Sequence, residues 1–317
     1  MNILIGGSLP PLQAALAAIG TVNVLPGEGP ERDAFLARHG ADVECLVWPP
    51  FIGALPPLLV ARLPALRHIA GMGAGYETID AAGAGARGIC VTNTPRAVTD
   101  DTADTGLYLI LAAQRRFPAA ERHLRAGKWT FATPYPRTTT VHGKVLGIVG
   151  FGRIGRAVGQ RAEACGMTVI YYARTPKPDV SWMRAETLED LARKSDILLS
   201  ILPGGEATRG LIGATIFDAL GPNGIFVSLG RGTAVDEPAL VAALQNGVIA
   251  GAGLDVYADE PHVPSTLIAM ENVVLLPHVG GATDHVIASV GRDLIANVRA
   301  VAEGRAPPDA VPEAPWR

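Results

Sequence analysis

Three polar side chains follow apolar runs in the C-terminal half of the chain: Arg231, Glu260 and His278. In an open α/β sheet the carboxyl ends of parallel strands line the ligand crevice, so residues from separate strands can converge there. Arg231 is permanently charged and forked, and can bind a carboxylate and polarise a ketone. His278 can donate a proton near neutral pH, and Glu260 can bond its other ring nitrogen. Taken singly, each also has a simpler explanation: a salt bridge, a turn carboxylate, or a histidine bonded to a backbone carbonyl.

A glycine-rich turn precedes these residues, between a predicted strand at 145–149 and a predicted helix at 153–165. In a GxGxxG turn the first glycine permits the tight bend, the second lets backbone approach a pyrophosphate, and the third lets helix and strand pack closely. The helix N-terminus adds free N–H groups and the positive end of its dipole. This setting predicts a dinucleotide site rather than a turn without a ligand. The predicted contacts are Gly150, Gly152, Arg153, Ile154 and Gly155.

The end of the next predicted strand, 168–172, distinguishes the two nicotinamide dinucleotides, because an acid there would bond the adenosine ribose of NAD. No acid follows directly. Arg174 offers a planar fork to a 2′-phosphate, Thr175 a hydroxyl and Lys177 a further charge. The loop therefore predicts NADP as cofactor, with NADPH preferred over NADH. The alternative is that Arg174 and Lys177 are solvated loop cations.

The elements that must position these residues form two series of alternating apolar runs and helical segments, which is typical of an α/β fold with two doubly wound parallel sheets. Long helices at 99–116 and 284–302 connect the series, so we expect one domain from residues 1–98 and 284–317 and a second from 99–283. Strands are expected at 2–6, 22–25, 43–48, 68–71 and 90–92, and then at 145–149, 168–172, 197–202, 225–229, 251–256 and 273–276.

Composition agrees with small-molecule partners. A chain of 317 residues that is 48% hydrophobic can bury more than one core. Its net charge of −3 is spread without runs, which gives no reason to expect binding to nucleic acid or to a membrane surface. The three cysteines form no CxxC pair and no secretory leader is recognisable, so we expect a cytoplasmic protein without disulfides. The histidines lack the spacing of metal ligands, and we expect no metal.

These segments, in this order and spacing, resemble the D-2-hydroxyacid dehydrogenase family, and within it the NADP-type glyoxylate and hydroxypyruvate reductases. The match is most specific over 147–155, 231–239 and 253–283. The resemblance implies a Rossmann cofactor domain inserted into a flavodoxin-like substrate domain. It also implies reduction of a small 2-oxo acid, such as glyoxylate or hydroxypyruvate, to the D-2-hydroxy acid by hydride transfer from NADPH. His278 would be the proton donor, Glu260 its partner and Arg231 the substrate clamp.

The resemblance assigns further contacts. The backbone N–H groups of Ala74 and Gly75 would hold the substrate carboxylate. Trp48 could overhang the substrate pocket, or it could instead belong to a Pro-stiffened surface loop with aromatic packing. Asp104 stands where the family usually carries Glu. Other implied cofactor contacts are Thr102, Leu202, Pro203, Thr208, Leu229, Gly230, Asp255 and Gly280.

Other readings remain open. A larger 2-oxo acid, of the phenylpyruvate or 2-ketogluconate type, could be the substrate. The chain could also be an NAD-type lactate or phosphoglycerate dehydrogenase, or a dinucleotide-sensing protein related to the corepressors that share the fold. Residues 117–141 resemble the arm through which these enzymes pair two cofactor domains, which implies a homodimer.

Overall fold

The computed structural model describes residues 1–317 and divides the chain into two compact units. Unit 1 comprises Met1–Val98 and Thr283–Arg317, and unit 2 comprises Thr99–Ala282. The first division falls where the sequence places it, and the second falls one residue earlier, because Thr283 belongs with the helix that it caps. No helix in the structure is long and apolar enough to cross a membrane.

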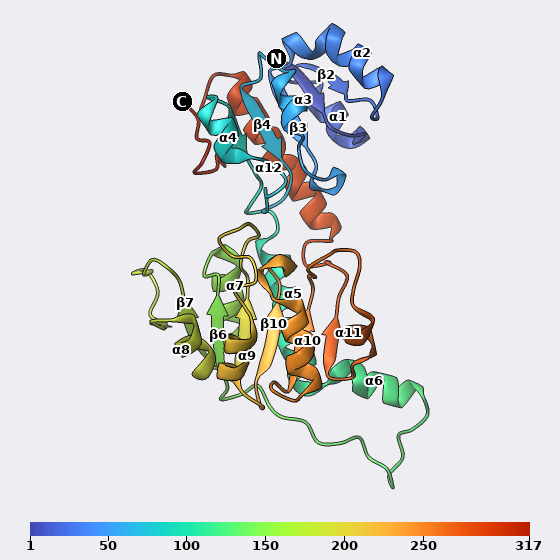
Figure 1. The fold of residues 1–317 in the computed structure, drawn as a ribbon, viewed down its shortest axis with the longest axis vertical. Coiled ribbons are helices and arrows are strands. Elements are labelled where there is room, and N and C mark those ends of the chain that lie inside the picture. Colours follow the sequence, from blue (N-terminus) through green and yellow to red (C-terminus); the bar gives the residue numbers. More distant parts are fainter. The chain divides into compact units, whose positions relative to one another are not determined.

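Unit 1 contains a five-stranded parallel sheet in the order β2-β1-β3-β4-β5 (Figure 1), which is the flavodoxin-like order. The strands are β1 Asn2–Ile5, β2 Thr21–Val24, β3 Cys45–Trp48, β4 His68–Gly71 and β5 Cys90–Thr92. The helices are α1 Pro10–Leu16, α2 Pro30–His39, α3 Pro57–Ala61, α4 Ala81–Ala86 and α12 Asp284–Ala302, with 3-10 turns η1 Gly40–Asp42 and η2 Pro50–Ile52.

Both faces of this sheet are buried because successive side chains of a strand point to opposite faces. Ile3 and Ile5 of β1 join a core with residues of α1 and α12, whereas Leu4 joins a second core with residues of α2, α3 and α4. Strands buried on both faces have nearly continuous apolar sequences, which explains why the sequence predicts them within two residues.

Within unit 1, the last twelve residues lie beside β5. The amide of Val311 donates to the carbonyl of Val91 at 2.9 Å, and the amide of Val91 donates to the carbonyl of Ala314 at 3.0 Å. Val311 and Ala314 are buried. The assignment of residues 284–317 to the first domain does not by itself indicate that this proline-containing segment pairs with β5.

Unit 2 contains a seven-stranded parallel sheet in the order β12-β11-β10-β9-β6-β7-β8, the Rossmann order extended by one strand. The strands are β6 Val145–Val149, β7 Thr168–Tyr172, β8 Met183–Arg184, β9 Ile197–Ser200, β10 Ile225–Ser228, β11 Gly251–Leu254 and β12 Val273–Leu275. The helices are α5 Thr99–Arg115, α6 Phe117–Arg125, α7 Arg153–Ala164, α8 Leu188–Arg193, α9 Ala214–Leu220, α10 Glu237–Gln245 and α11 Ser265–Ala269, with a 3-10 turn η3 Gly232–Ala234.

Helices cover both faces of the second sheet. Residues of α5 and α7 share one core with the strands, and residues of α8, α9 and α10 share another. The chain order reverses between β6 and β9, which creates the switch point where ligands of such sheets bind. Several predicted strands are one or two residues too long, because apolar residues such as Leu229 continue past the last paired residue of the strand. The sequence also missed β8, which is only two residues long.

A buried polar line crosses the sheet of unit 1. The Sγ atom of Cys45 lies 3.5 Å from Nδ1 of His68, and Nε2 of His68 lies 2.9 Å from Oγ1 of Thr92. Burial, reinforced by the charge of Arg67, lowers the pKa of His68 from 6.5 to about 3. Both ring nitrogens thus have partners while the ring is neutral, and a protonated ring would be an uncompensated buried charge.

Acidification is expected to destabilise the protein through His68. Below about pH 6.5 the unfolded chain binds a proton at this residue, whereas the folded chain stays neutral down to about pH 3, so the free energy of unfolding falls as pH falls through this window. The contribution is at most about 1.4 kcal/mol per pH unit. Urea unfolding at pH 7, 6 and 5 should show a smaller loss of stability on acidification in His68→Gln than in the wild type.

The matched control is His285→Gln, because His285 is exposed on α12 of the same unit. It should keep the pH dependence of the wild type. If His68→Gln also kept it, the neutral buried state assigned to His68 would be wrong.

Candidate active site

The turn between β6 and α7 has three glycines in three different environments. Gly150 has φ +88°, and a Cβ there would overlap the backbone carbonyl of Ile201. A Cβ on Gly155 would lie 2.9 Å from the carbonyl oxygen of Gly150. A Cβ on Gly152 would meet no atom of the chain within 4 Å. The structure therefore explains Gly150 and Gly155 by their own packing, whereas Gly152 leaves open space next to the start of a helix.

The N-terminus of α7 faces that space without a competing partner. Gly152 is its N-cap, no side chain caps the helix, and its first turn holds no acid. Unsatisfied N–H groups and the positive end of the dipole favour an anion at this position. Arg153 is exposed and Ile154 half-buried in the same turn. The residues fit the pyrophosphate of a dinucleotide.

The loop after β7 carries the predicted 2′-phosphate residues. Arg174 and Thr175 are exposed, and the side chain of Arg174 makes no ion pair or hydrogen bond within the chain. Lys177 is half-buried, and its amide donates to the hydroxyl of Tyr171 at 3.2 Å. A free guanidinium beside a hydroxyl is the arrangement that a phosphate requires.

Three successive strands of the same sheet position the predicted catalytic residues. Arg231 follows β10, Glu260 lies in the segment after β11, and His278 follows β12. Nδ1 of His278 lies 2.7 Å from Oε2 of Glu260. The other carboxylate oxygen of Glu260 accepts the amide of Tyr257 at 3.0 Å. Glu260 is thus fixed while it orients the imidazole, which leaves Nε2 of His278 available for proton exchange.

His278 has an unusual backbone that Asp255 holds in place. Its φ is +55°, a left-handed conformation that costs about 1–2 kcal/mol for a residue with a Cβ. Asp255, at the end of β11, is 1% exposed and accepts the amides of the two following residues, Val279 at 2.8 Å and Gly280 at 2.9 Å. Burial raises the pKa of Asp255, and these two amides oppose the rise. The carboxylate therefore closes the turn that presents His278.

Two further side chains hold the same turn. The hydroxyl of Thr102 on α5 donates to the carbonyl of Gly280 at 3.2 Å, and the hydroxyl of Tyr257 donates to the carbonyl of Leu276 at 2.8 Å. A Cβ on Gly280 would lie 3.0 Å from Oδ2 of Asp255. The sequence singled out Thr102, Asp255 and Gly280 as cofactor contacts but missed this shared structural role, and it missed Tyr257 entirely. No motif marks these residues as neighbours.

Asp104 serves the packing of two helices. Its Oδ1 atom accepts Nε of Arg161 at 2.7 Å, and Asp100 accepts the same guanidinium at 3.2 Å. Because Asp104 is on α5 and Arg161 on α7, the shorter acid links these two helices.

The predicted wall around the nucleotide lies at the ends of β9 and β10. The amide of Arg231 donates to the carbonyl of Leu202 at 3.0 Å, and a Cβ on Gly230 would overlap that carbonyl. Leu229 is 5% exposed and belongs to the core beneath. Thr208 donates its hydroxyl to the carbonyl of Pro203 at 2.7 Å. The structure thus brings these residues together at one edge of the sheet.

Unit 1 holds the predicted substrate contacts. The turn after β4 bends at Gly73, whose φ is +94°, and Asn93 donates to the carbonyl of Ala74 at 2.7 Å. The amides of Ala74 and Gly75 have no acceptor within the chain. Trp48 is 4% exposed, and its indole N–H donates to the carbonyl of Gly53 at 2.9 Å. Its ring packs in the core of unit 1, which favours the packing alternative for this residue over a role in the pocket wall.

No group of three or more His, Cys, Asp or Glu side chains gathers where it could hold a metal ion.

Comparison with known proteins identifies the family. Residues 107–280, more than half of the chain, match the model described as D-isomer specific 2-hydroxyacid dehydrogenase, NAD binding domain. The chain is 41% identical over 276 residues to glyoxylate/hydroxypyruvate reductase A of Arabidopsis thaliana. The aligned region covers 87% of this chain and 88% of that protein. It is 41% identical over 254 residues to hydroxyphenylpyruvate reductase of Plectranthus scutellarioides, covering 80% of each.

Solved structures agree with this result. The NADPH-dependent glyoxylate/hydroxypyruvate reductase of Sinorhizobium meliloti, solved with NADP and malonate, superposes with a TM-score of 0.90 and 36% identity, covering 100% of this chain and 98% of that one. The fold and site define a dinucleotide-binding oxidoreductase with two doubly wound sheets. This chain belongs to the D-isomer specific 2-hydroxyacid dehydrogenase family, as the resemblance of its motifs predicts.

Gly152→Ala should separate folding from cofactor binding. The backbone of Gly152 is extended and a Cβ there meets no protein atom, so the free energy of unfolding should change by less than about 1 kcal/mol. The Cβ would occupy space needed for close approach of a pyrophosphate, so dinucleotide affinity should fall at least about 10-fold. Urea unfolding and fluorescence titration with NADPH measure the two quantities.

Gly27→Ala is the matched control, because a Cβ on Gly27 also meets nothing within 4 Å. It should alter neither quantity. Normal NADPH affinity in Gly152→Ala would show that the open space beside this glycine does not receive the cofactor.

Proposed function

We propose that this protein reduces a small 2-oxo acid of the glyoxylate or hydroxypyruvate class to the D-2-hydroxy acid, with NADPH as the reductant. The observation that carries the proposal is the pair of His278 and Glu260, 2.7 Å apart at the end of a sheet whose preceding strand ends at Arg231. A carboxylate-oriented imidazole and a guanidinium are the groups that such a reduction needs.

The proposed mechanism divides the chemistry among these three side chains. Arg231 binds the substrate carboxylate and polarises the ketone, whose oxygen becomes negative as the reaction proceeds. NADPH, held by its pyrophosphate at the glycine turn, would supply the hydride. His278 donates a proton from Nε2 to the ketone oxygen, while Glu260 accepts the hydrogen bond from Nδ1 and stabilises the charged ring. In unit 1, the unpaired amides of Ala74 and Gly75 support a further contact to the substrate carboxylate.

In this proposal unit 2 is the dinucleotide-binding domain and unit 1 is the substrate domain. Gly150, Gly152, Arg153, Ile154 and Gly155 would receive the pyrophosphate, and Arg174 and Thr175 the 2′-phosphate. The free side chain of Arg174 and the absence of an acid directly after β7 support the preference for NADPH. The Sinorhizobium meliloti reductase is NADPH-dependent, which supports the same assignment.

A larger substrate is the second candidate. One relative at 41% identity is a hydroxyphenylpyruvate reductase, which favours an aromatic 2-oxo acid. The reaction and the catalytic residues would be the same in both cases, and only the side-chain pocket would differ.

We also propose that the protein is a cytoplasmic homodimer. Three cysteines are free, which suits a reducing compartment. The arm formed by α6 and the following segment exposes large apolar side chains that a partner subunit would cover: Phe117, Leu124, Trp129 and Phe131.

An NADPH-oxidation screen tests the function. Glyoxylate, hydroxypyruvate, pyruvate, phenylpyruvate and 2-ketogluconate are compared by kcat/KM, each with NADPH and NADH. We expect the highest values with glyoxylate or hydroxypyruvate and NADPH, because the guanidinium fork fits a 2′-phosphate. Higher kcat/KM with NADH would refute the cofactor assignment, and cofactor binding without turnover of any 2-oxo acid would favour a dinucleotide-sensing protein.

His278→Ala and Arg231→Ala should separate chemistry from cofactor binding. Each removes a group that acts on the reacting carbonyl, so kcat/KM for the 2-oxo acid should fall by about 100-fold or more. NADPH affinity should stay within a few-fold of the wild type, since both substitutions leave the glycines proposed to receive the pyrophosphate intact. Steady-state kinetics and NADPH titration check both parts, and near-normal turnover in either variant contradicts the role given to that residue.

A further inference from the structure

The loop between β7 and β8, residues 173–182, is fastened at several points. The guanidinium of Arg184 donates through Nε to the carbonyl of Ala173 at 3.0 Å, and the amide of Lys177 donates to the hydroxyl of Tyr171 at 3.2 Å. At its far end, the indole of Trp182 donates to Glu163 of α7 at 2.6 Å. The loop that would receive a 2′-phosphate is therefore held at both ends by hydrogen bonds within the chain.

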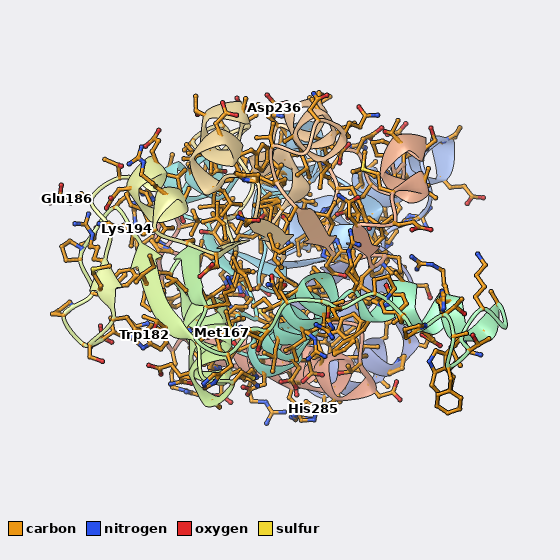
Figure 2. The ribbon with its side chains drawn as sticks, turned by 90° about the horizontal axis from the view of Figure 1, so that it is seen from below. Met167, Trp182, Glu186, Lys194, Asp236 and His285 are labelled. Carbon is orange, nitrogen blue, oxygen red and sulfur yellow. The ribbon has the colours of Figure 1, made fainter.

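An aromatic group joins this loop to the glycine turn. The ring of Phe151, which lies within the turn, stacks on Tyr171 at 4.2 Å and meets Trp182 edge-on at 5.5 Å. The guanidinium of Arg156 on α7 lies over the same Phe151 ring, 5.3 Å from the ring centroid. Figure 2 shows Trp182 on the side of unit 2 where Met167 lies, which is the side that α7 covers.

Arg156 also pairs with an acid of the loop. Its Nη1 and Nη2 atoms both donate to the carboxylate of Asp179, the second at 3.0 Å. Asp179 is the only acid between residues 173 and 182. The pairing lowers the pKa of Asp179, and Lys177 contributes to the same shift, so this carboxylate lies within electrostatic reach of a cation of the loop.

The charges of the loop explain why this pair matters. Arg174 and Lys177 give the loop two positive charges, and Asp179 removes one of them. Without Arg156, Asp179 would attract Lys177 and repel a dianionic phosphate bound beside Arg174. With Arg156 bound to both carboxylate oxygens, the acid is neutralised by a residue outside the loop.

We propose that Arg156 determines the preference for NADPH over NADH by neutralising Asp179, so that the cations of the loop remain available to the 2′-phosphate. Arg156 acts through Asp179 and is therefore a positioning residue. The proposal rests on the NADPH assignment made above. It predicts an effect on the choice between the two cofactors rather than on the chemical step, because NADH lacks the group that Asp179 would repel.

The test is a set of variants compared by kcat/KM for NADPH and for NADH at saturating 2-oxo acid. Arg156→Gln keeps much of the side-chain stem but removes the charge, and should lower the NADPH-to-NADH ratio by about 5-fold or more at low salt. Arg156→Lys should retain most of the ratio. The double variant Arg156→Gln with Asp179→Asn should recover it, because the repelling carboxylate is then absent. The loss should shrink in 0.5 M salt, where charges at the surface are screened.

Asp179→Asn alone separates charge from mere fastening of the loop. If Arg156 acts by neutralisation, this variant keeps or raises the NADPH-to-NADH ratio. If the ion pair only fastens the loop, Asp179→Asn lowers the ratio as Arg156→Gln does and the double variant does not recover it, which overturns the proposal. An equal loss with both cofactors in Arg156→Gln overturns it as well.

Lys194→Gln is the matched control. Lys194, the residue after α8, pairs with Asp190 of that helix at 2.8 Å. Residues of α8 pack in a different core from the one that α7 and Trp182 share. Its loss should leave the ratio unchanged. A wild-type protein that prefers NADH would refute the NADPH assignment itself, and this is measured before any variant is compared.

Discussion

The candidate site depends on one buried carboxylate. Asp255 accepts the amides of Val279 and Gly280 with its two oxygens, and these are the residues directly after His278. These two bonds help to offset the cost of a left-handed backbone at a histidine. The position of the imidazole, its contact with Glu260 and the direction of its free nitrogen all follow from this closed turn. A group that must present one nitrogen to a substrate gains precision when its backbone, as well as its ring, is held.

The fold class and the family that the sequence predicted are confirmed. Both could be predicted because they depend on short-range sequence patterns. Short apolar runs, such as those that form β6 and β10, alternate with amphipathic segments. The GxGxxG motif lies within six consecutive residues, so it can be recognised without knowledge of long-range contacts. The sequence could single out Arg231, Glu260 and His278 because each of them follows a strand of one parallel sheet. That Glu260 lies 2.7 Å from His278 agrees with the predicted pairing, while the catalytic roles of these residues and of Arg231 stay predictions.

What the sequence could not predict depends on long-range packing. Tyr257 reads as one more apolar residue after a strand, and only the structure brings its hydroxyl to the carbonyl of Leu276, nineteen residues along the chain. The buried line through Cys45, His68 and Thr92 arises from the register of three separate strands. Trp48 illustrates a choice that the sequence leaves open between a pocket wall and a packed aromatic residue. Its indole N–H donates to the carbonyl of Gly53 in its own loop, which favours packing.

The two halves of the proposed cofactor site obey different physical rules. At the glycine turn, specificity is steric, since only a missing side chain lets backbone approach an anion, and Gly152 shows this as open space. In the loop after β7, specificity is electrostatic and depends on a balance among Arg174, Lys177 and Asp179. Phe151 joins the two, because it lies inside the turn and contacts both Tyr171 and the guanidinium that neutralises the loop acid. A substitution at Arg156 can therefore alter cofactor choice while the glycines that receive the pyrophosphate stay intact.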